Sequence, residues 1–132
     1  MTVVDASAIL ELLIPADQVR HDAIAQSLPH PATPWLAPDI LPFEVLSVLY
    51  RHVRRGKLSE ELADRALRRL AGLPIELVPT RSLIASALTP MLHSASIALY
   101  VTLALRAKEP LLAADPQLTD AAKDAGIEVV SL

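Results

Sequence analysis

The chain has 132 residues, 52% of them hydrophobic and 20% charged, which is enough for one domain spanning residues 1–132 around a single core. It contains no cysteine, which excludes a disulfide framework and a cysteine-based zinc site. The net charge is −3, and the apolar segments are far shorter than the ~20 residues that span a bilayer. Because Asp5 and Glu11 interrupt the apolar N-terminus, it does not resemble a secretory signal, and we expect a soluble cytoplasmic protein with no membrane partner.

Residues 1–13, MTVVDASAILELL, have the pattern of a strand that stops at an acid and turns into a helix. Strand character covers residues 2–4, and an apolar helical run begins at Ala8. Asp5 therefore stands at the carboxyl end of a strand, where ligands and chemistry collect in open α/β sheets. The structural alternative is that Asp5, or its neighbour Ser7, is a helix cap.

Caps and breakers divide the remaining chain into strands and helices. Asp17 and Ser59 are expected to begin helices, and Gly56 and Gly126 to end them. Helices are expected at residues 18–28, 41–55, 59–72, 82–92, 94–107 and 116–125, and strands at residues 35–37, 75–78, 111–114 and 127–130. Pro90 is expected to disturb its helix near the end. This alternation predicts βαβ units and a mainly parallel sheet with helices on both faces.

Two further acids could meet Asp5. Asp115 also follows an apolar strand and precedes a helix, so a parallel sheet would bring it to the same edge, although Pro116 after it is equally typical of a helix cap. Glu44 lies in PFEVLSVLY, which is so apolar that most of its helix must be buried. Because burying an unpaired carboxylate costs several kcal/mol, we expect Glu44 to face solvent or to have a cation beside it. A shared Mg²⁺ or Mn²⁺ ion would supply that cation, since both prefer oxygen ligands.

Four segments form a combined pattern over nearly the whole chain: VVDASAIL, PFEVLSVLYR, IALYVTLA and LLAADPQL. In order and spacing they resemble the PIN-domain ribonucleases, specifically the VapC-type toxins of bacterial type II toxin–antitoxin pairs. The resemblance implies a three-layer α/β/α sandwich with a central, mainly parallel five-stranded sheet. It also implies a Mg²⁺- or Mn²⁺-dependent endoribonuclease that hydrolyses RNA, is commonly a homodimer and is silenced by a cognate antitoxin protein.

Carried over residue by residue, the resemblance assigns catalysis and metal binding to Asp5, Glu44 and Asp115, and a supporting role to Ser7. The fourth acid of the family is missing, because Ile97 stands at its position. Loss of one ligand and one negative charge should weaken metal binding and slow the chemistry. Two functions therefore remain open: a weakened ribonuclease, or a catalytically silent PIN-like module that binds an antitoxin or RNA without cleaving.

Other chemistries have less support in the sequence. Ser96 stands where the family commonly has an aromatic residue, and Ile97 lies on an ordinary apolar stripe with Tyr100. His93 and Ser94, one turn before Ile97, could replace the lost acid, but such a pair is more typical of a helix cap. Haloacid dehalogenase-type hydrolases need a second acid two residues after the first, where this chain has a serine.

Seven of the twelve basic residues lie between positions 51 and 69: Arg51, Arg54, Arg55, Lys57, Arg65, Arg68 and Arg69. A phosphate-binding surface would explain them, but a solvated helical face with interspersed acids is the simpler interpretation. For partners, the aliphatic helices at residues 8–28 and 41–55 offer surface for an antitoxin or a second subunit, and an arginine of the partner would fit the acidic pocket.

Overall fold

The computed structural model describes residues 1–89, 91–130 and 132. Within this part of the chain, four strands form one parallel sheet in the order β3-β2-β1-β4. The strands are β1 (Val3–Val4), β2 (Trp35–Pro38), β3 (Ile75–Val78) and β4 (Leu111–Leu112). Except for β3 at the edge, these strands are buried, as expected for a parallel sheet with helices on both faces.

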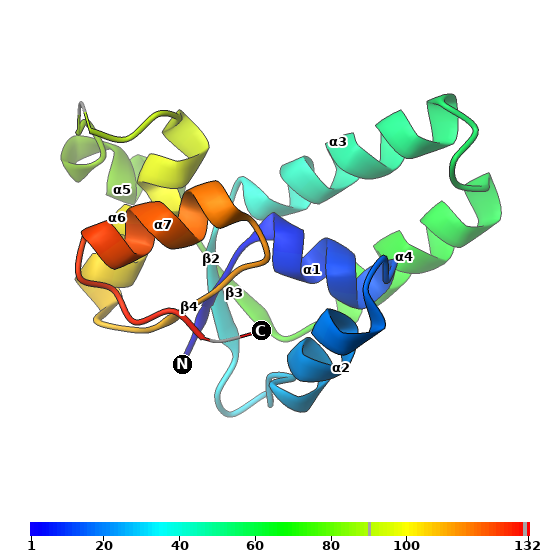
Figure 1. The fold of residues 1–132 in the computed structure, drawn as a ribbon, viewed down its shortest axis with the longest axis horizontal. Coiled ribbons are helices and arrows are strands. Elements are labelled where there is room, and N and C mark those ends of the chain that lie inside the picture. Colours follow the sequence, from blue (N-terminus) through cyan, green and yellow to red (C-terminus); the bar gives the residue numbers. More distant parts are fainter. Residues whose placement is uncertain (90, 131) are drawn as a thin grey trace.

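Helices cover both faces of this sheet (Figure 1). On one side lie α1 (Ala6–Leu13), α2 (Gln18–Gln26), α3 (Leu41–Arg54) and α4 (Glu60–Gly72). On the other lie α5 (Thr80–Leu83), the 3₁₀ turn η1 (Ile84–Ser86), α6 (Ala95–Ala107) and α7 (Pro116–Asp124). The architecture is an α/β fold with a parallel sheet between two layers of helices, as the alternating pattern predicted.

The predicted fifth strand is wrong for the described residues. Val129 forms only an isolated parallel bridge with Leu111 beside β4. The segment exchanges two hydrogen bonds with Leu111, through the carbonyl of Glu128 and the N–H of Val130, whereas the N–H of Ile127 is bonded to the carbonyl of Ala122 at the end of α7. The sheet therefore has four strands in the described residues, and residues 127–130 add one bridge at its edge.

The predicted helix over residues 82–92 is also wrong in its second half. Helical structure begins earlier, at Thr80, and after the 3₁₀ turn it ends at Ser86. Of the described residues that remain in this range, only Ala87 and Leu92 pack against the core, whereas Leu88 and Met91 are 92% and 81% exposed. The expected effect of Pro90 lies outside the described residues.

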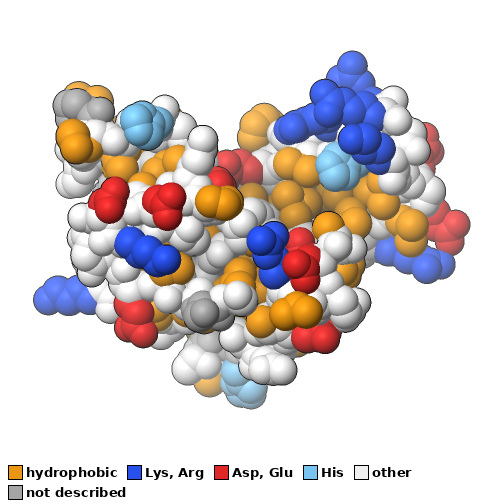
Figure 2. Space-filling view, viewed as in Figure 1, with side chains coloured by type: hydrophobic (Ala, Val, Ile, Leu, Met, Phe, Trp, Pro, Cys, Tyr) orange, Lys and Arg blue, Asp and Glu red, His pale blue; other side chains and the backbone are white. Residues whose placement is uncertain are grey.

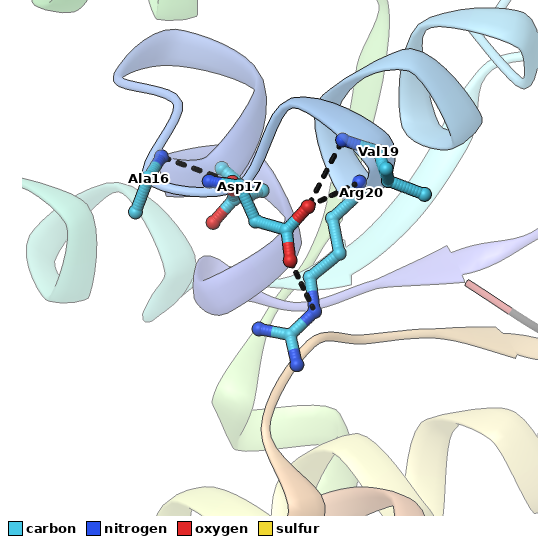
Figure 3. Close-up of polar contacts among 5 residues, drawn as sticks. Ala16, Asp17, Val19 and Arg20 are labelled. Carbon is cyan, nitrogen blue, oxygen red and sulfur yellow. Dashed lines mark hydrogen bonds and ion pairs between the residues drawn. The ribbon is translucent and has the colours of Figure 1, made fainter.

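Side-chain caps begin the longer helices as predicted at Asp17, Ser59 and Ser94. The Asp17 carboxylate accepts hydrogen bonds from two backbone N–H groups in the first turn of α2, and it lies 4.0 Å from the guanidinium of Arg20 (Figure 3). Glu11 is buried, and its carboxylate accepts from the N–H groups of Ala16 and Asp17. These contacts fix the turn that joins α1 to α2.

Hydrophobicity agrees with this architecture. The core joins β1, β2 and β4 to the inner faces of α1, α3 and α6, and its largest side chains include Ile9, Leu49 and Tyr100. In the described residues, no helix combines the length and the hydrophobicity that crossing a bilayer requires.

Candidate functional site

The carboxyl ends of β1 and β4 lie side by side. Val4 pairs with Leu112 in the parallel register, and the N–H of Asp5 donates to the carbonyl of Leu112 at 3.3 Å. Asp5 thus leaves the sheet next to the segment that leads to Asp115. The strand–acid–helix pattern predicted this neighbourhood correctly.

Asp5 is held by a dense set of donors. It is the N-cap of α1, and its Oδ1 accepts from the N–H of Ala8 at 3.0 Å. The Ser7 hydroxyl lies 2.8 Å from both carboxylate oxygens, and its Oγ in turn accepts from the N–H of Ala114 at 2.9 Å. Asp5, rather than Ser7, is therefore the cap, and Ser7 connects the ends of β1 and β4.

Burial makes the charge of Asp5 costly. Only 5% of the residue is exposed, and this desolvation raises the pKa of Asp5 from 3.8 to about 6, against the lowering effect of its hydrogen bonds to Ala8 and Ser7. The negative charge of Asp115 raises that pKa further, so the two carboxylates are close enough to repel each other. Asp5 is nevertheless mostly ionised at neutral pH and would be stabilised by a cation.

Asp115 combines two roles at the same edge. It is the N-cap of α7, where its Oδ1 accepts from the N–H of Gln117 at 3.0 Å and Pro116 occupies the first turn. The capping interpretation of Asp115 is thus correct. Because its charge also acts on Asp5, capping does not remove Asp115 from the acidic edge.

The carboxylate of Glu44 has hydrogen-bond partners that the sequence did not predict. It lies half-buried in the first turn of α3, with neither full exposure nor a cationic side chain bonded to it within the described residues. Instead, its Oε2 accepts from the Ser96 hydroxyl at 2.6 Å and its Oε1 from the Tyr100 hydroxyl at 2.7 Å. These donors lie four residues apart on α6, so one face of that helix clamps Glu44.

Tyr100 links Glu44 to Asp5. Burial, the charge of Glu44 and the hydrogen bond to it hold the pKa of Tyr100 far above its usual value of 10.0, and the charge of Asp5 adds to this rise. A backbone hydrogen bond from Ala6 acts in the opposite direction. The hydroxyl therefore stays protonated and donates to Glu44, between the acid of α3 and the start of α1.

Ile97 is buried on α6, 7% exposed, and lines a pocket of about 500 Å³ with residues of α7. His93 is exposed and lines this same pocket, together with Asp120 and Asp124. Ser94 caps α6 by accepting from the N–H of Ile97 at 3.1 Å. The cap interpretation of Ser94 is thus correct, and Ile97 is a packing residue.

The donor set fits a divalent ion only in part. Asp5 and Asp115 offer carboxylate oxygens at one edge, and Asp5 is a buried anion without a cationic partner among the described residues. In that same part of the chain, no three acidic or histidine side chains lie close enough together to hold a metal. Mg²⁺ commonly uses only one or two carboxylates and completes its shell with water and substrate phosphate, so a pair of carboxylates is compatible with such an ion.

Acidic side chains appear at the base of a hollow between α3 and the lobe formed by α6 and α7 (Figure 2). A parallel α/β fold with acids at the carboxyl edge and a hollow beside them has the arrangement of an α/β domain that binds its ligand at this edge. The PIN domain family matches residues 2–124, and the chain belongs to that family. No curated protein sequence matches it.

Sequence reasoning missed Ser96 and Tyr100 as parts of the site. In the sequence, Ser96 stands out only as a departure from the family pattern, and Tyr100 only as part of an apolar stripe. The available signal was their spacing of four residues, which places two hydroxyls on one helical face. Nothing in the local sequence indicated that Glu44 would receive them.

Proposed function

We propose that this PIN-domain protein is a divalent-metal-dependent endoribonuclease and the toxin of a type II toxin–antitoxin pair. The observation that carries the proposal is the buried, ionisable Asp5 beside Asp115 at the carboxyl edge of the sheet. A buried anion next to a second anion is unfavourable for stability alone, and such sites are frequently functional. Membership of the PIN family supports the nuclease chemistry.

Asp5 and Asp115 would hold Mg²⁺ or Mn²⁺, and Glu44 would add negative charge from α3 without being a third ligand, since the described residues form no three-ligand cluster. A bound divalent ion supplies a nucleophile from water at neutral pH and stabilises charge on the phosphate. Ser7 keeps both oxygens of Asp5 fixed at the edge. Ser96 and Tyr100 keep the carboxylate of Glu44 in one orientation, so that the acids are preorganised.

A silent binding module is the second candidate. It is favoured by Ile97, which removes one family acid, and by the hydroxyls that occupy both oxygens of Glu44. Two acids at one edge bind a metal more weakly than four, so slow turnover is expected even in the nuclease. Such a module would still bind its partners but would not cleave RNA.

The partners we propose are a cognate antitoxin, RNA and a second copy of the chain. A groove of about 480 Å³ lies between α3 and α4, lined by apolar side chains that include Leu46, Val53 and Leu67. An amphipathic antitoxin helix would suit this groove, and an arginine following it would pair with Asp5 or Asp115. An antitoxin complex without a basic side chain at these acids would contradict the proposed arginine contact.

RNA cleavage with Mn²⁺ tests the nuclease. Single-stranded RNA is incubated with the wild type, with Asp5→Asn and with a matched control, Asp120→Asn, which changes an exposed acid on α7. We expect slow cleavage by the wild type and the control, and at least a 100-fold loss in Asp5→Asn, since metal-assisted steps contribute several kcal/mol. Equal activity of Asp5→Asn would reject the nuclease site, whereas RNA binding without cleavage would select the silent module.

A further inference from the structure

One face of α3 remains without a role in the acidic site. Phe43, Ser47, Tyr50 and Arg54 follow one another at helical spacing on the side opposite the buried Leu41, Val45 and Leu49. The two aromatic residues are largely exposed, Phe43 by 71% and Tyr50 by 64%. Large exposed aromatic side chains are unusual on a protein whose aromatic content is only 3%, and they indicate a contact surface.

This face ends in a basic cluster. Figure 2 shows Lys and Arg side chains gathered over the far end of α3. We define the basic end of α3 as Arg51, Arg54, Arg55 and Lys57. Residues 45–59 contain no aspartate or glutamate, and within the described part of the chain these four cations form no ion pair.

The basic residues of α4 behave differently. Arg65 pairs with Glu61 and Arg68 with Asp64, each at 2.8 Å, and Arg69 donates to the carbonyl of Leu12. The solvated-face interpretation is therefore correct for α4. It does not apply to the basic end of α3, whose positive charge is left for an anionic partner.

We infer that Phe43, Tyr50 and the basic end of α3 bind single-stranded RNA and lead it to the acidic edge. The inference rests on the proposed function, whose substrate it positions. Exposed aromatic rings stack on bases whatever their identity, and unpaired cations follow the phosphates, which together are the usual means of binding single strands. Phe43 is adjacent to Glu44 in the first turn, so the strand would reach the acids at that end.

The dimensions suit a short single strand. Phe43 and Arg54 are 11 residues apart along α3, which at ~1.5 Å per residue corresponds to about 16 Å. Tyr50 and Arg54 also line the α3 side of the groove between α3 and α4, whereas Glu60 and Asp64 line its α4 side and would repel phosphates. The strand would therefore follow the exposed face of α3 along the rim of this groove, on the side away from α4.

Binding without metal separates this inference from the nuclease proposal. Fluorescence anisotropy of a labelled 12-nucleotide oligouridine is measured in EDTA with Arg54→Ala/Arg55→Ala and with Arg65→Ala/Arg68→Ala as the matched control. We expect about tenfold weaker binding in the first variant and less than a twofold change in the control. Loss of two phosphate contacts should also reduce the slope of log K against log salt by about 1.4.

Tyr50→Ala tests the stacking surface, with Tyr50→Phe as its control. Alanine should weaken binding roughly tenfold, the effect typical of losing one stacked base, whereas phenylalanine keeps the ring. A duplex of the same length should bind more weakly than the single strand. Unchanged affinity in Tyr50→Ala and in Arg54→Ala/Arg55→Ala would overturn the inference, as would a shift of oligomeric state without loss of RNA affinity.

Cleavage by the same preparations in Mn²⁺ keeps the two proposals distinguishable. A wild type that cleaves RNA while the α3 variants bind as tightly as it does would overturn only the α3 surface. A wild type that binds through α3 and never cleaves would support this surface and reject the nuclease activity.

Discussion

Asp5 and Glu44 are two acids near the same end of one sheet, but the fold treats their charges differently. Asp5 is almost fully buried beside another carboxylate, and its pKa is raised to about 6. Glu44 is half-buried and receives two hydroxyl donors from α6. Both carboxylates receive donors from the protein, but those of Asp5 do not offset its burial and the nearby charge of Asp115, so a cation would stabilise Asp5 more than Glu44.

The largest expected effect is on the stability of the metal-free protein. The folded-state pKa of Asp5, about 6, exceeds its ordinary value of 3.8, so the folded state holds the proton more tightly between these pH values. The stability that this proton gives is present below about pH 4 and is lost as pH rises through 6, by about 3 kcal/mol.

Asp5→Asn should remove this loss, because asparagine also caps helices but carries no charge. In EDTA the variant should unfold at higher urea than the wild type at pH 8 and at similar urea near pH 4. Asp120→Asn, at an exposed position, keeps Asp5 and should therefore retain the pH dependence of the wild type. Equal stabilities of Asp5→Asn and the wild type at pH 8 would mean that the burial of Asp5 is not costly.

Restoring an acid at position 97 should strengthen metal binding at Asp5 and so increase its difference from Glu44. Ile97→Asp should destabilise the metal-free protein by about 2 kcal/mol or more, because Ile97 is buried, and should tighten Mn²⁺ binding about tenfold if its carboxylate reaches the acidic edge. Ile97→Asn is the control that lacks the charge. Titration calorimetry measures the Mn²⁺ affinity and urea unfolding measures the stability. Equal Mn²⁺ affinity of the two variants would mean that a carboxylate at position 97 does not reach the acidic edge.

Removing one donor to Glu44 should have a smaller effect. Tyr100→Phe deletes the hydroxyl bonded to Glu44 and should cost about 1–2 kcal/mol of stability, since hydrogen bonds to charged groups exceed the ordinary ~1 kcal/mol but water can partly replace this one. Urea unfolding at pH 7 measures the change. An unchanged free energy of unfolding would show that water replaces the Tyr100 hydroxyl at Glu44 equally well.

Ser96→Ala should cost least, about 1 kcal/mol, because the remaining Tyr100 hydroxyl still fixes Glu44. The double variant Ser96→Ala/Tyr100→Phe should lose more than the sum of the two, since Glu44 then has neither donor. Strict additivity, measured by the same unfolding experiment, would mean that the two hydroxyls act independently.

The sequence predicted best what short-range chemistry determines. Asp5 and Asp115 follow strands and cap helices, so local pattern alone placed both at one edge. The donors to Glu44 could not be predicted, because Ser96 and Tyr100 lie 52 and 56 residues away from it along the chain. Residues 127–130 look like a strand locally, but the end of α7 already holds the first of them.

Binding of Mn²⁺ by titration calorimetry tests the central claim most directly, without any need for turnover. We predict weak binding of one ion by the wild type, loss of binding in Asp5→Asn and in Asp115→Asn, and a smaller reduction in Glu44→Gln. Heat of binding that persists unchanged in Asp5→Asn, or its absence in the wild type, would contradict the claim that the acidic edge is a metal site.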